Sequence, residues 1–200
     1  MNLRDELLTR IKEEQTQRDN LERDGTLSDE YHPERDSKHI EDARWLDEII
    51  TKNGLPKLED VGILGIEAVC RIINNAISLP TLQKKYLPML QEKSTAGEYP
   101  TLAVALIEDC IAFHEQRSQI YGLYSDWNSD GKLIIPFIDN ETDINVNREK
   151  LGLIPLQEAR QKLSESKDIP PKNYAAKKAA YEAWRIRVGW VTSSAHGTHP

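Results

Sequence analysis

The sequence has only two cysteines, Cys70 and Cys110, and both lie inside apolar helical patterns. A small secreted protein usually carries a larger, paired set of cysteines that form disulfides. An apolar helical face keeps a thiol protonated and unreactive. We therefore expect two reduced, buried thiols in a cytoplasmic protein, with a disulfide between them as the alternative that the sequence leaves open.

The chain also lacks any long hydrophobic run. The opening residues, MNLRDELLTRIKEEQTQRD, contain no apolar segment of the kind that a signal peptide needs. No later run approaches the roughly 18 uninterrupted apolar residues of a membrane span. These rules predict a protein without a membrane span, although export by a route that needs no signal peptide would leave no trace in them.

The chain has fewer basic than acidic residues, 26 against 33, and its net charge is −7. Nucleic-acid-binding proteins usually present a basic face to the phosphates, so we expect no nucleic-acid partner. The charge is unevenly spread. Residues 172–200 carry +4, which leaves −11 for the first 171 residues. A basic tail on an acidic body can fold back onto it or bind an acidic partner.

Apolar residues recur at helical spacing through most of the chain. Turn-forming residues at 125–131 and the short apolar run at 133–135 interrupt the pattern. The sequence predicts an all-α fold, an irregular bundle of five or six main helices with a small extended or hairpin insertion near 123–138 and a C-terminal helix. We expect helices over residues 2–23, 38–53, 59–78, from 80 onward, 100–121, 145–151, 155–166 and 172–188.

The segment 59–78 is the most apolar of the chain. The small residues Gly62, Gly65 and Ala68 leave one side of this segment without bulky side chains. We expect it to be the central helix, closely packed by its neighbours.

The break at Ile169-Pro170-Pro171 divides the chain into a helical domain, 1–166, and a C-terminal basic aromatic helix with a flexible tail, 167–200. The aromatic residues of this last helix form a stripe along one side of it. This stripe can lie in the groove of a partner or on a membrane, or it can pack on the body of the protein. The candidate partner-binding residues are Tyr174, Lys177, Lys178, Tyr181, Trp184, Arg185 and Val188.

Several short segments match, in chain order, an uncharacterised bacterial protein family. They are residues 3–8 with Gln15 and Arg18, then 49–50, 53–56 and 61–62, then 116–117 with 121–122, then 136–141 and 143–156. Together they resemble domain-of-unknown-function family 6624 over roughly residues 2–163. The resemblance supplies no established activity, so it bears on the fold more than on the function.

The chain departs from that family where a histidine is expected. Asn53 stands in place of the His of a His-Gly-Trp-Pro segment, and Asn74-Asn75 lie where the family carries Gln-His-Ala-Asp. Leu123-Tyr124 replace a Thr-Gln pair. If the family uses those histidines as acid or base, this chain has lost them, since Asn does not exchange a proton near neutral pH.

No metal or cofactor is predicted. Asp126, Asn128, Asp130 and Gly131 fit the first half of a calcium loop, but Phe137 occupies the position of the essential bidentate Glu, so we expect a polar turn. Cys110 and His114, four residues apart on one helix, could hold zinc only with further ligands that the sequence does not nominate. Motifs for a serine nucleophile or a phosphate-binding loop are absent.

Polar residues in the family-like segments suggest a pocket for an anionic or amide-bearing ligand, if they converge in space. The alternative is that they are solvated or bridge parts of the structure, as Arg148 would do by tying Asp139 to the body. The residues are Gln15, Arg18, Asn74, Asn75, Gln116, Arg117, Tyr121, Asp139 and Arg148.

Three functions therefore remain open. The first, which the acidic body, the basic aromatic tail and the missing histidines favour, is a non-catalytic protein-interaction or regulatory module whose partner is another protein. The second is an enzyme of unassigned chemistry that uses the polar pocket. The third is a carrier of a C-terminal peptide, 192–200, which a partner recognises or modifies. The sequence does not indicate an oligomeric state.

Overall fold

The computed structural model describes residues 2–24 and 33–191. Within them it contains eight helices and one two-stranded sheet, so the predicted all-α fold is confirmed. The packing divides the chain into two compact units, Met1–Ile107 and Glu108–Pro200, with the boundary inside helix α5 (Thr101–Glu115). The separate tail predicted at 167–200 stays a prediction, and its last residues, 192–200, lie outside the described part.

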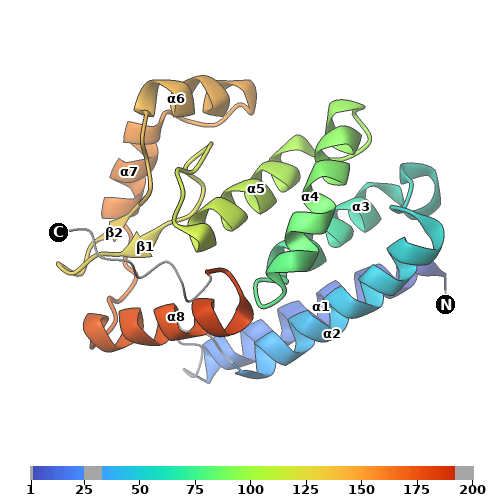
Figure 1. Cartoon of the computed structure of the whole chain (residues 1–200), viewed down its shortest axis with the longest axis horizontal. Helices are drawn as coiled ribbons and strands as arrows, with labels where there is room; N and C mark the ends of the chain where they lie inside the picture. Colours follow the sequence, from blue (N-terminus) through green and yellow to red (C-terminus); the bar gives the residue numbers. More distant parts are fainter. Residues whose placement is uncertain (1, 25–32, 192–200) are drawn as a thin grey trace. The chain divides into compact units, whose positions relative to one another are not determined.

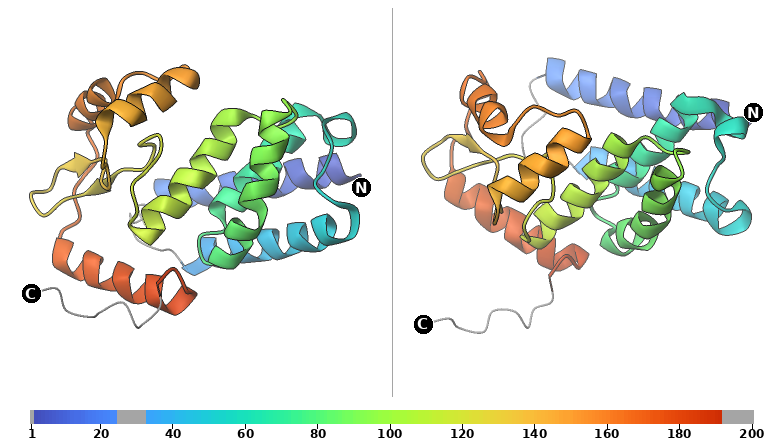
Figure 2. Two further views of the ribbon diagram at one scale, coloured as in Figure 1. Left: turned by 45° about the horizontal axis from the view of Figure 1, so that its top comes forward. Right: turned by 90° about the horizontal axis from the view of Figure 1, so that it is seen from above.

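The first unit contains α1 (Leu3–Arg23), α2 (Pro33–Asn53), α3 (Leu58–Asn75), α4 (Pro80–Thr95) and the first turns of α5. α1 packs along both α2 and α3, and Figures 1 and 2 show α1 and α2 side by side. The aliphatic side chains that helical spacing places on the inner faces are fully buried, among them Leu7, Leu46, Val61, Ile66 and Ile73.

α2 begins at Pro33, earlier than the start predicted at residue 38. Proline suits the first helical turn because its missing N–H has no helical partner there. Arg35, which precedes the predicted start, and Lys38 pair with the α1 carboxylates of Glu14 and Glu13. The contact between α1 and α2 therefore stabilises a helical turn that local composition did not indicate.

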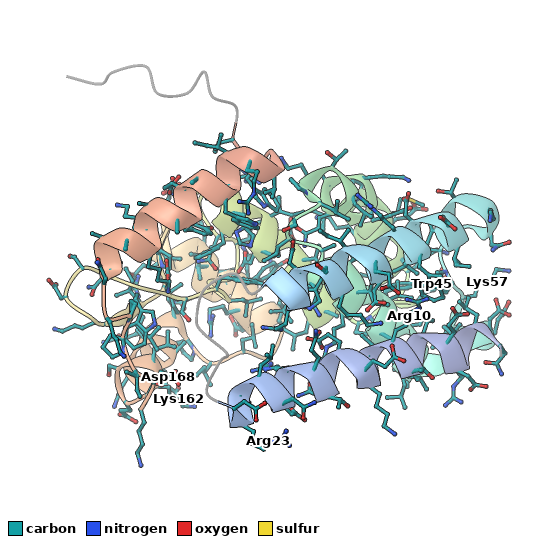
Figure 3. The ribbon with its side chains drawn as sticks, turned by 90° about the horizontal axis from the view of Figure 1, so that it is seen from below. Arg10, Arg23, Trp45, Lys57, Lys162 and Asp168 are labelled. Carbon is teal, nitrogen blue, oxygen red and sulfur yellow. The ribbon has the colours of Figure 1, made fainter. Side chains whose placement is uncertain are left out.

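A cation–π contact also joins these two helices. The guanidinium carbon of Arg10 lies 4.2 Å from the centroid of the Trp45 ring, and Figure 3 shows the two labelled side chains between α1 and α2. Arg10 also donates a hydrogen bond to Asp42 over 2.7 Å. The polar contacts of α1 thus lie along the same side as its contact with α2.

The central helix is not continuous, because its backbone breaks at Gly62, where φ is 67° and ψ is 174°. Glycine adopts this left-handed region without the steric cost that a Cβ brings. The two residues after the break, Ile63 and Leu64, are each 52% exposed. The close packing predicted for this helix holds for its buried side and does not extend to Ile63 and Leu64.

The second unit contains the last turns of α5, the hairpin strands β1 (Asp126–Trp127) and β2 (Leu133–Ile134), α6 (Glu141–Lys150), α7 (Leu156–Ser164) and α8 (Tyr174–Val188). The strands are antiparallel, which confirms the predicted hairpin insertion. A small hydrophobic core is formed by Ile135, Ile144 and Leu156, with Ile138, Ala159 and Leu163 packed against them.

α5 ends at Glu115, six residues before the predicted end at Tyr121. Gln116 has a positive φ of 56°, which stops the helix. The carboxylate of Asp109 then accepts hydrogen bonds from the backbone N–H groups of Ile120 and Leu123. These bonds replace the helical ones that residues 116–121 would have made.

Candidate functional site

The first unit holds a buried carboxylate, Glu14, at the meeting of three helices. Its oxygens lie 3.2 Å from Arg35 and 3.4 Å from His39, both on α2, and 2.6 Å from Arg71 on α3. Only 2% of Glu14 is exposed. A buried charge needs such partners, because desolvation would otherwise cost several kcal/mol, in the range of roughly 3–5 when a partner is lost.

Burial by itself raises the pKa of the Glu14 carboxyl. The hydrogen bonds with His39 and Arg35 and the guanidinium charge of Arg71 outweigh that effect and lower the pKa to about 2. Glu14 is therefore ionised at neutral pH and bound to cations on two neighbouring helices.

A small cavity lies beside this carboxylate. Its volume is about 10 Å³, which is the space for one water molecule. The cavity is lined by Ile11, Glu14, His39, Asp42, Ile72 and Asn75.

Two of the four predicted pocket residues in this unit join the Glu14 cluster. Gln15 accepts a hydrogen bond from Arg71 over 2.7 Å, and Asn75 lines the small cavity. The other two lie apart from it: Arg18 is exposed on α1, and the backbone carbonyl of Asn74 accepts a hydrogen bond from a side-chain amide. The sequence pointed to the polar character of this region but missed Glu14, whose neighbours come from three helices.

In the second unit, Arg148 is a structural residue. It is 4% exposed, and its guanidinium donates to the backbone carbonyls of Tyr121, Gly122 and Ile154 over 2.7, 3.2 and 2.6 Å. Gln119 similarly bonds the backbone of residues 124 and 136. With Asp109, these side chains hold the loop 116–124 in place. The bridge that Arg148 was expected to form to Asp139 is thus replaced by bonds to the main chain.

The remaining predicted pocket residues contact other residues of the second unit. Gln116 donates to Glu182 over 2.7 Å, and Arg117 pairs with Glu115 over 2.6 Å. The backbone N–H of Asp139 donates to a serine hydroxyl. The nine residues therefore divide between the two units, four in the first and five in the second.

The aromatic stripe of α8 packs within the second unit. Trp184 and Arg185 are 5% and 2% exposed, whereas Lys178 is exposed. Tyr181 and Trp184 both contact the ring of His114 at the end of α5. The predicted partner-binding side chains Tyr181, Trp184 and Arg185 thus cover α5, while Tyr174, Lys177 and Val188 are half-buried.

His114 occupies an aromatic enclosure. Its ring stacks on Trp190 at 5.0 Å and its Nδ1 lies 2.8 Å from the Tyr181 hydroxyl. Burial, and then the charge of Arg185, lower the pKa of His114 to about 3. It is a neutral packing residue at ordinary pH, and among the described residues no group of three or more His, Cys, Asp or Glu is arranged to hold a metal.

The half calcium loop is a polar turn, as predicted. The Asn128 side-chain oxygen accepts hydrogen bonds from the backbone N–H groups of Asp130 and Lys132 over 3.0 and 2.9 Å. The side-chain oxygen of Asn128 is therefore already hydrogen-bonded within the turn. Both cysteines are free and buried, as expected from the sequence.

A feature that the sequence analysis missed lies on the outside of α3. Ile63 and Leu64 are exposed there, and the acidic side chain of Glu67, also exposed, lies one turn after them. The exposed Asp60 precedes the break at Gly62. We call Ile63, Leu64 and Glu67 the outer face of α3. Leu58, at the start of the helix, is a further large aliphatic residue with 43% exposure. The signal in the sequence was the glycine at position 62, next to an apolar pair.

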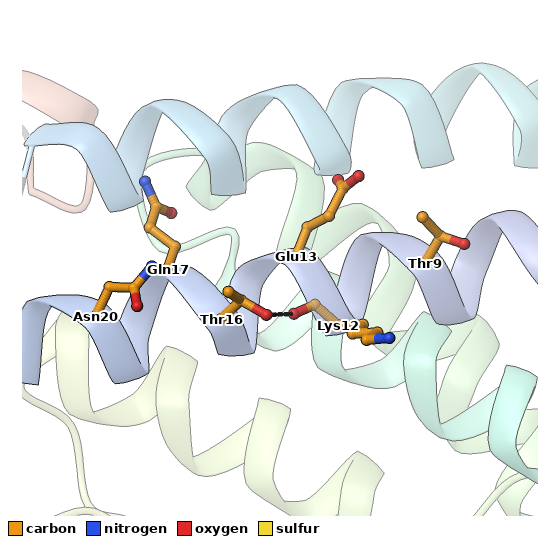
Figure 4. Close-up of a pocket in the computed structure, with 6 residues that line it drawn as sticks. All are labelled: Thr9, Lys12, Glu13, Thr16, Gln17 and Asn20. Atoms are coloured by element: carbon orange, nitrogen blue, oxygen red, sulfur yellow. Dashed lines mark hydrogen bonds between the residues drawn. The ribbon is translucent and has the colours of Figure 1, made fainter.

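A depression on α1 has a volume of about 390 Å³. Figure 4 shows Glu13 and Gln17 pointing toward α2, while a hydrogen bond from Thr16 to the Lys12 carbonyl stays within α1. Its described lining residues all lie on one helix, so they form a polar surface rather than a site where groups converge. They are Thr9, Lys12, Glu13, Thr16, Gln17 and Asn20.

Comparison of the chain with protein-family models, curated proteins and solved structures gives no match. In the part of the chain that the structure describes, no helix has the length and apolar character needed to cross a membrane.

Proposed function

We propose that this chain is a non-catalytic protein-interaction module of the bacterial cytoplasm, and that the outer face of α3 is its binding surface. The observation that carries the proposal is the exposure of Ile63 and Leu64, at 52% each, one turn before the exposed carboxylate of Glu67. Exposed apolar patches rimmed by polar residues are typical of protein-binding sites. Burying such surface contributes about 25 cal/mol per Å².

The state of the buried acids supports a non-catalytic role. A general acid or base acts best when its pKa lies near the working pH. The contacts of Glu14 lower its pKa to about 2 instead, and Asp109 is occupied by backbone N–H groups. Arg148, one of the predicted pocket residues, donates its hydrogen bonds to the main chain.

The enzyme hypothesis keeps one supporting observation, the cavity beside Glu14, His39 and Asn75. Its volume of about 10 Å³ admits one water molecule. Ligand pockets usually measure roughly 300–1,000 Å³. The cavity would have to open by moving α1, α2 or α3 before a substrate could enter.

Cellular location and origin belong to the same proposal. The two free, buried thiols of Cys70 and Cys110 fit a reducing compartment. The resemblance to family 6624 supports a bacterial origin. The third hypothesis, a recognised peptide at 192–200, falls outside the described residues and stays a prediction.

Affinity capture from host lysate tests the proposal with a matched pair of variants. Leu64→Asp places a charge on the outer face of α3, and Val146→Asp does the same at a 47% exposed position on α6. We expect the wild type and the α6 variant to capture the same protein, and the Leu64 variant to lose it. Capture of the same proteins by all three would overturn the proposed surface.

A further inference from the structure

The connection between α7 and α8 is an exposed segment that contains two consecutive prolines. Residues 166–173 form neither helix nor strand, and Figure 1 shows the chain passing the hairpin there. Ile169 is 81% exposed, the highest value for a large apolar side chain among the described residues. The proposed function makes no use of this segment, which belongs to the second unit.

The two prolines restrict the backbone of the segment. The rings of Pro170 and Pro171 fix φ at about −65°, and each favours an extended conformation in the residue before it. The favoured backbone is therefore polyproline II, which has three residues per turn. In that conformation Ser166, Ile169 and Lys172 lie along one edge, and all three are exposed. The apolar and the basic side chain thus share an edge that faces solvent.

Contacts within the second unit hold the segment in place. A Cβ at Gly131, in the hairpin, would lie 3.5 Å from the Pro170 ring, so this ring packs beside the hairpin. The Asp168 carboxylate accepts a hydrogen bond from the Ser166 hydroxyl over 2.6 Å, and the Asp168 N–H donates to the same hydroxyl oxygen. The segment is therefore ordered before any partner binds, which reduces the conformational entropy that binding must remove.

The main chain of the segment offers hydrogen-bond acceptors. Within the described part of the chain, the carbonyl groups of residues 167–172 accept no hydrogen bond. A polyproline II backbone has no internal hydrogen bonds, so these carbonyls can accept from a partner without breaking a bond of the fold.

We propose that residues 166–172 bind a second protein through a groove that aromatic side chains line. Grooves of this kind recognise proline-containing segments, because the preformed backbone loses little entropy on binding. The groove supplies an apolar surface for Ile169, hydrogen-bond donors for the carbonyls and a carboxylate for Lys172. The proposal goes beyond the proposed function, since the chain would then connect two proteins, one at each unit.

Affinity capture from host lysate, followed by peptide elution, tests this proposal. Proteins bound to the immobilised full chain are eluted with a synthetic peptide of residues 164–173. A parallel sample is eluted with the same peptide carrying alanine at positions 169–171. We expect the first peptide to release a protein that the second leaves bound, because alanine removes both the large apolar side chain and the restricted backbone.

Two full-length variants separate this segment from other exposed apolar positions. Ile169→Ser removes the apolar side chain of the segment, and Ile186→Ser does the same at a 41% exposed position on α8. Neither position is buried, so thermal unfolding should be unchanged, which checks that both variants fold. Ile169→Ser should bind the released protein at least about tenfold more weakly, whereas Ile186→Ser should bind it as the wild type does.

The released protein, once purified, reports on the groove itself. Peptide 164–173 contains no aromatic residue, so a change in fluorescence during its titration comes from aromatic side chains of the released protein. We expect such a change on binding. Lys172→Glu in the full chain should weaken binding, and the difference from the wild type should be greater at low salt.

Three results would each overturn the proposal: a peptide that releases no protein, equal release by both peptides, or an Ile169→Ser variant that binds as tightly as the wild type. The proposed function fails separately, because it concerns a surface of the first unit. Leu64→Asp should therefore leave the peptide-released protein bound.

Discussion

The Nδ1 atom of His114 lies 2.8 Å from the hydroxyl of Tyr181, and this contact joins the end of α5 to α8. Trp184 and Trp190 complete the enclosure of the ring. A charged imidazole is disfavoured there because burial removes its hydration and the guanidinium of Arg185 repels it. The attachment of α8 thus depends on a neutral histidine.

The burial of neutral His114 makes the stability of the second unit depend on pH. The pKa of His114 is about 3 in the fold, against 6.5 in the unfolded chain, so the unfolded state binds the proton first as the pH falls. The stability that neutral His114 provides is complete above pH 6.5 and is lost toward pH 3, by up to about 1.4 kcal/mol per pH unit. Urea unfolding followed by tryptophan fluorescence measures it, with His114→Gln as the variant that should lose this slope.

NMR offers the control for that experiment. The ring proton resonances of His114 should not shift between about pH 8 and pH 5 in the folded protein. A titration of this residue near 6.5 would show that the ring is solvated, and it would contradict the aromatic enclosure.

The Glu14 cluster predicts a cost for neutralising one buried carboxylate. Glu14→Gln leaves Arg35 and Arg71 without their anion, and both are partly exposed, so we expect a loss of about 2–3 kcal/mol in the free energy of unfolding. Glu13→Gln, one position away and 58% exposed, should change it by less than about 0.5 kcal/mol. Equal effects of the two changes in urea unfolding would refute a special role for Glu14.

The pH dependence of this cluster has the sign usual for an acid. Because the pKa of Glu14 falls from 4.5 in the unfolded chain to about 2 in the fold, its contribution is present above pH 4.5 and is lost as the pH falls through 2. The wild type and Glu14→Gln should therefore converge in stability as the solution is acidified below pH 4.5. Parallel curves would mean that the carboxylate is not the source of the difference.

Substitutions at two glycines of the second unit distinguish backbone strain from steric crowding. Gly122 and Gly152 have nearly equal positive φ values, 65° and 66°, but a Cβ at Gly122 would lie 2.9 Å from Leu156, whereas one at Gly152 meets nothing within 4 Å. Alanine at either position carries the left-handed penalty of about 1–2 kcal/mol. Gly122→Ala should cost about 1–3 kcal/mol more, because overpacking adds to that penalty. Thermal unfolding of both variants measures the difference, and equal melting temperatures would contradict the packing of Leu156 on the loop.

Arg148 provides a test of the loop 116–124. Arg148→Met removes donors from three backbone carbonyls and should destabilise the second unit by about 2–4 kcal/mol. Arg117→Met, at a 59% exposed position, should have an effect within about 0.5 kcal/mol. Chemical denaturation of both variants is the measurement, and a tolerated Arg148→Met would return this residue to the list of candidate ligand-binding groups.

The helices could be predicted because their apolar spacing is a local property. The end of α5 could not, since it depends on Asp109 accepting N–H groups from residues that follow the helix. The start of α2 at Pro33 depends in the same way on ion pairs between Arg35, Lys38 and α1. Helix boundaries that rest on contacts between distant side chains leave no periodic signal.

The candidate site also depends on contacts between distant residues, which the sequence does not reveal. Polarity singled out Gln15 and Asn75, but their neighbour Glu14 looked like one acid among many on a charged helix. Arg148 was recognised as a special residue, although its acceptors are main-chain carbonyls that carry no sequence identity. The exposure of Ile63 and Leu64 was not predicted, because an apolar pattern does not reveal which side of a broken helix has no neighbour.

Site-specific photo-crosslinking in host cells tests the central claim, that the outer face of α3 binds protein. A photoreactive amino acid replaces Leu64 in one variant and Val146 in the other, two exposed aliphatic positions on α3 and α6. The account predicts a discrete crosslinked protein band from position 64, either with a second copy of the chain or with another protein, and none from position 146. No crosslink from position 64, or the same pattern from both positions, would contradict it.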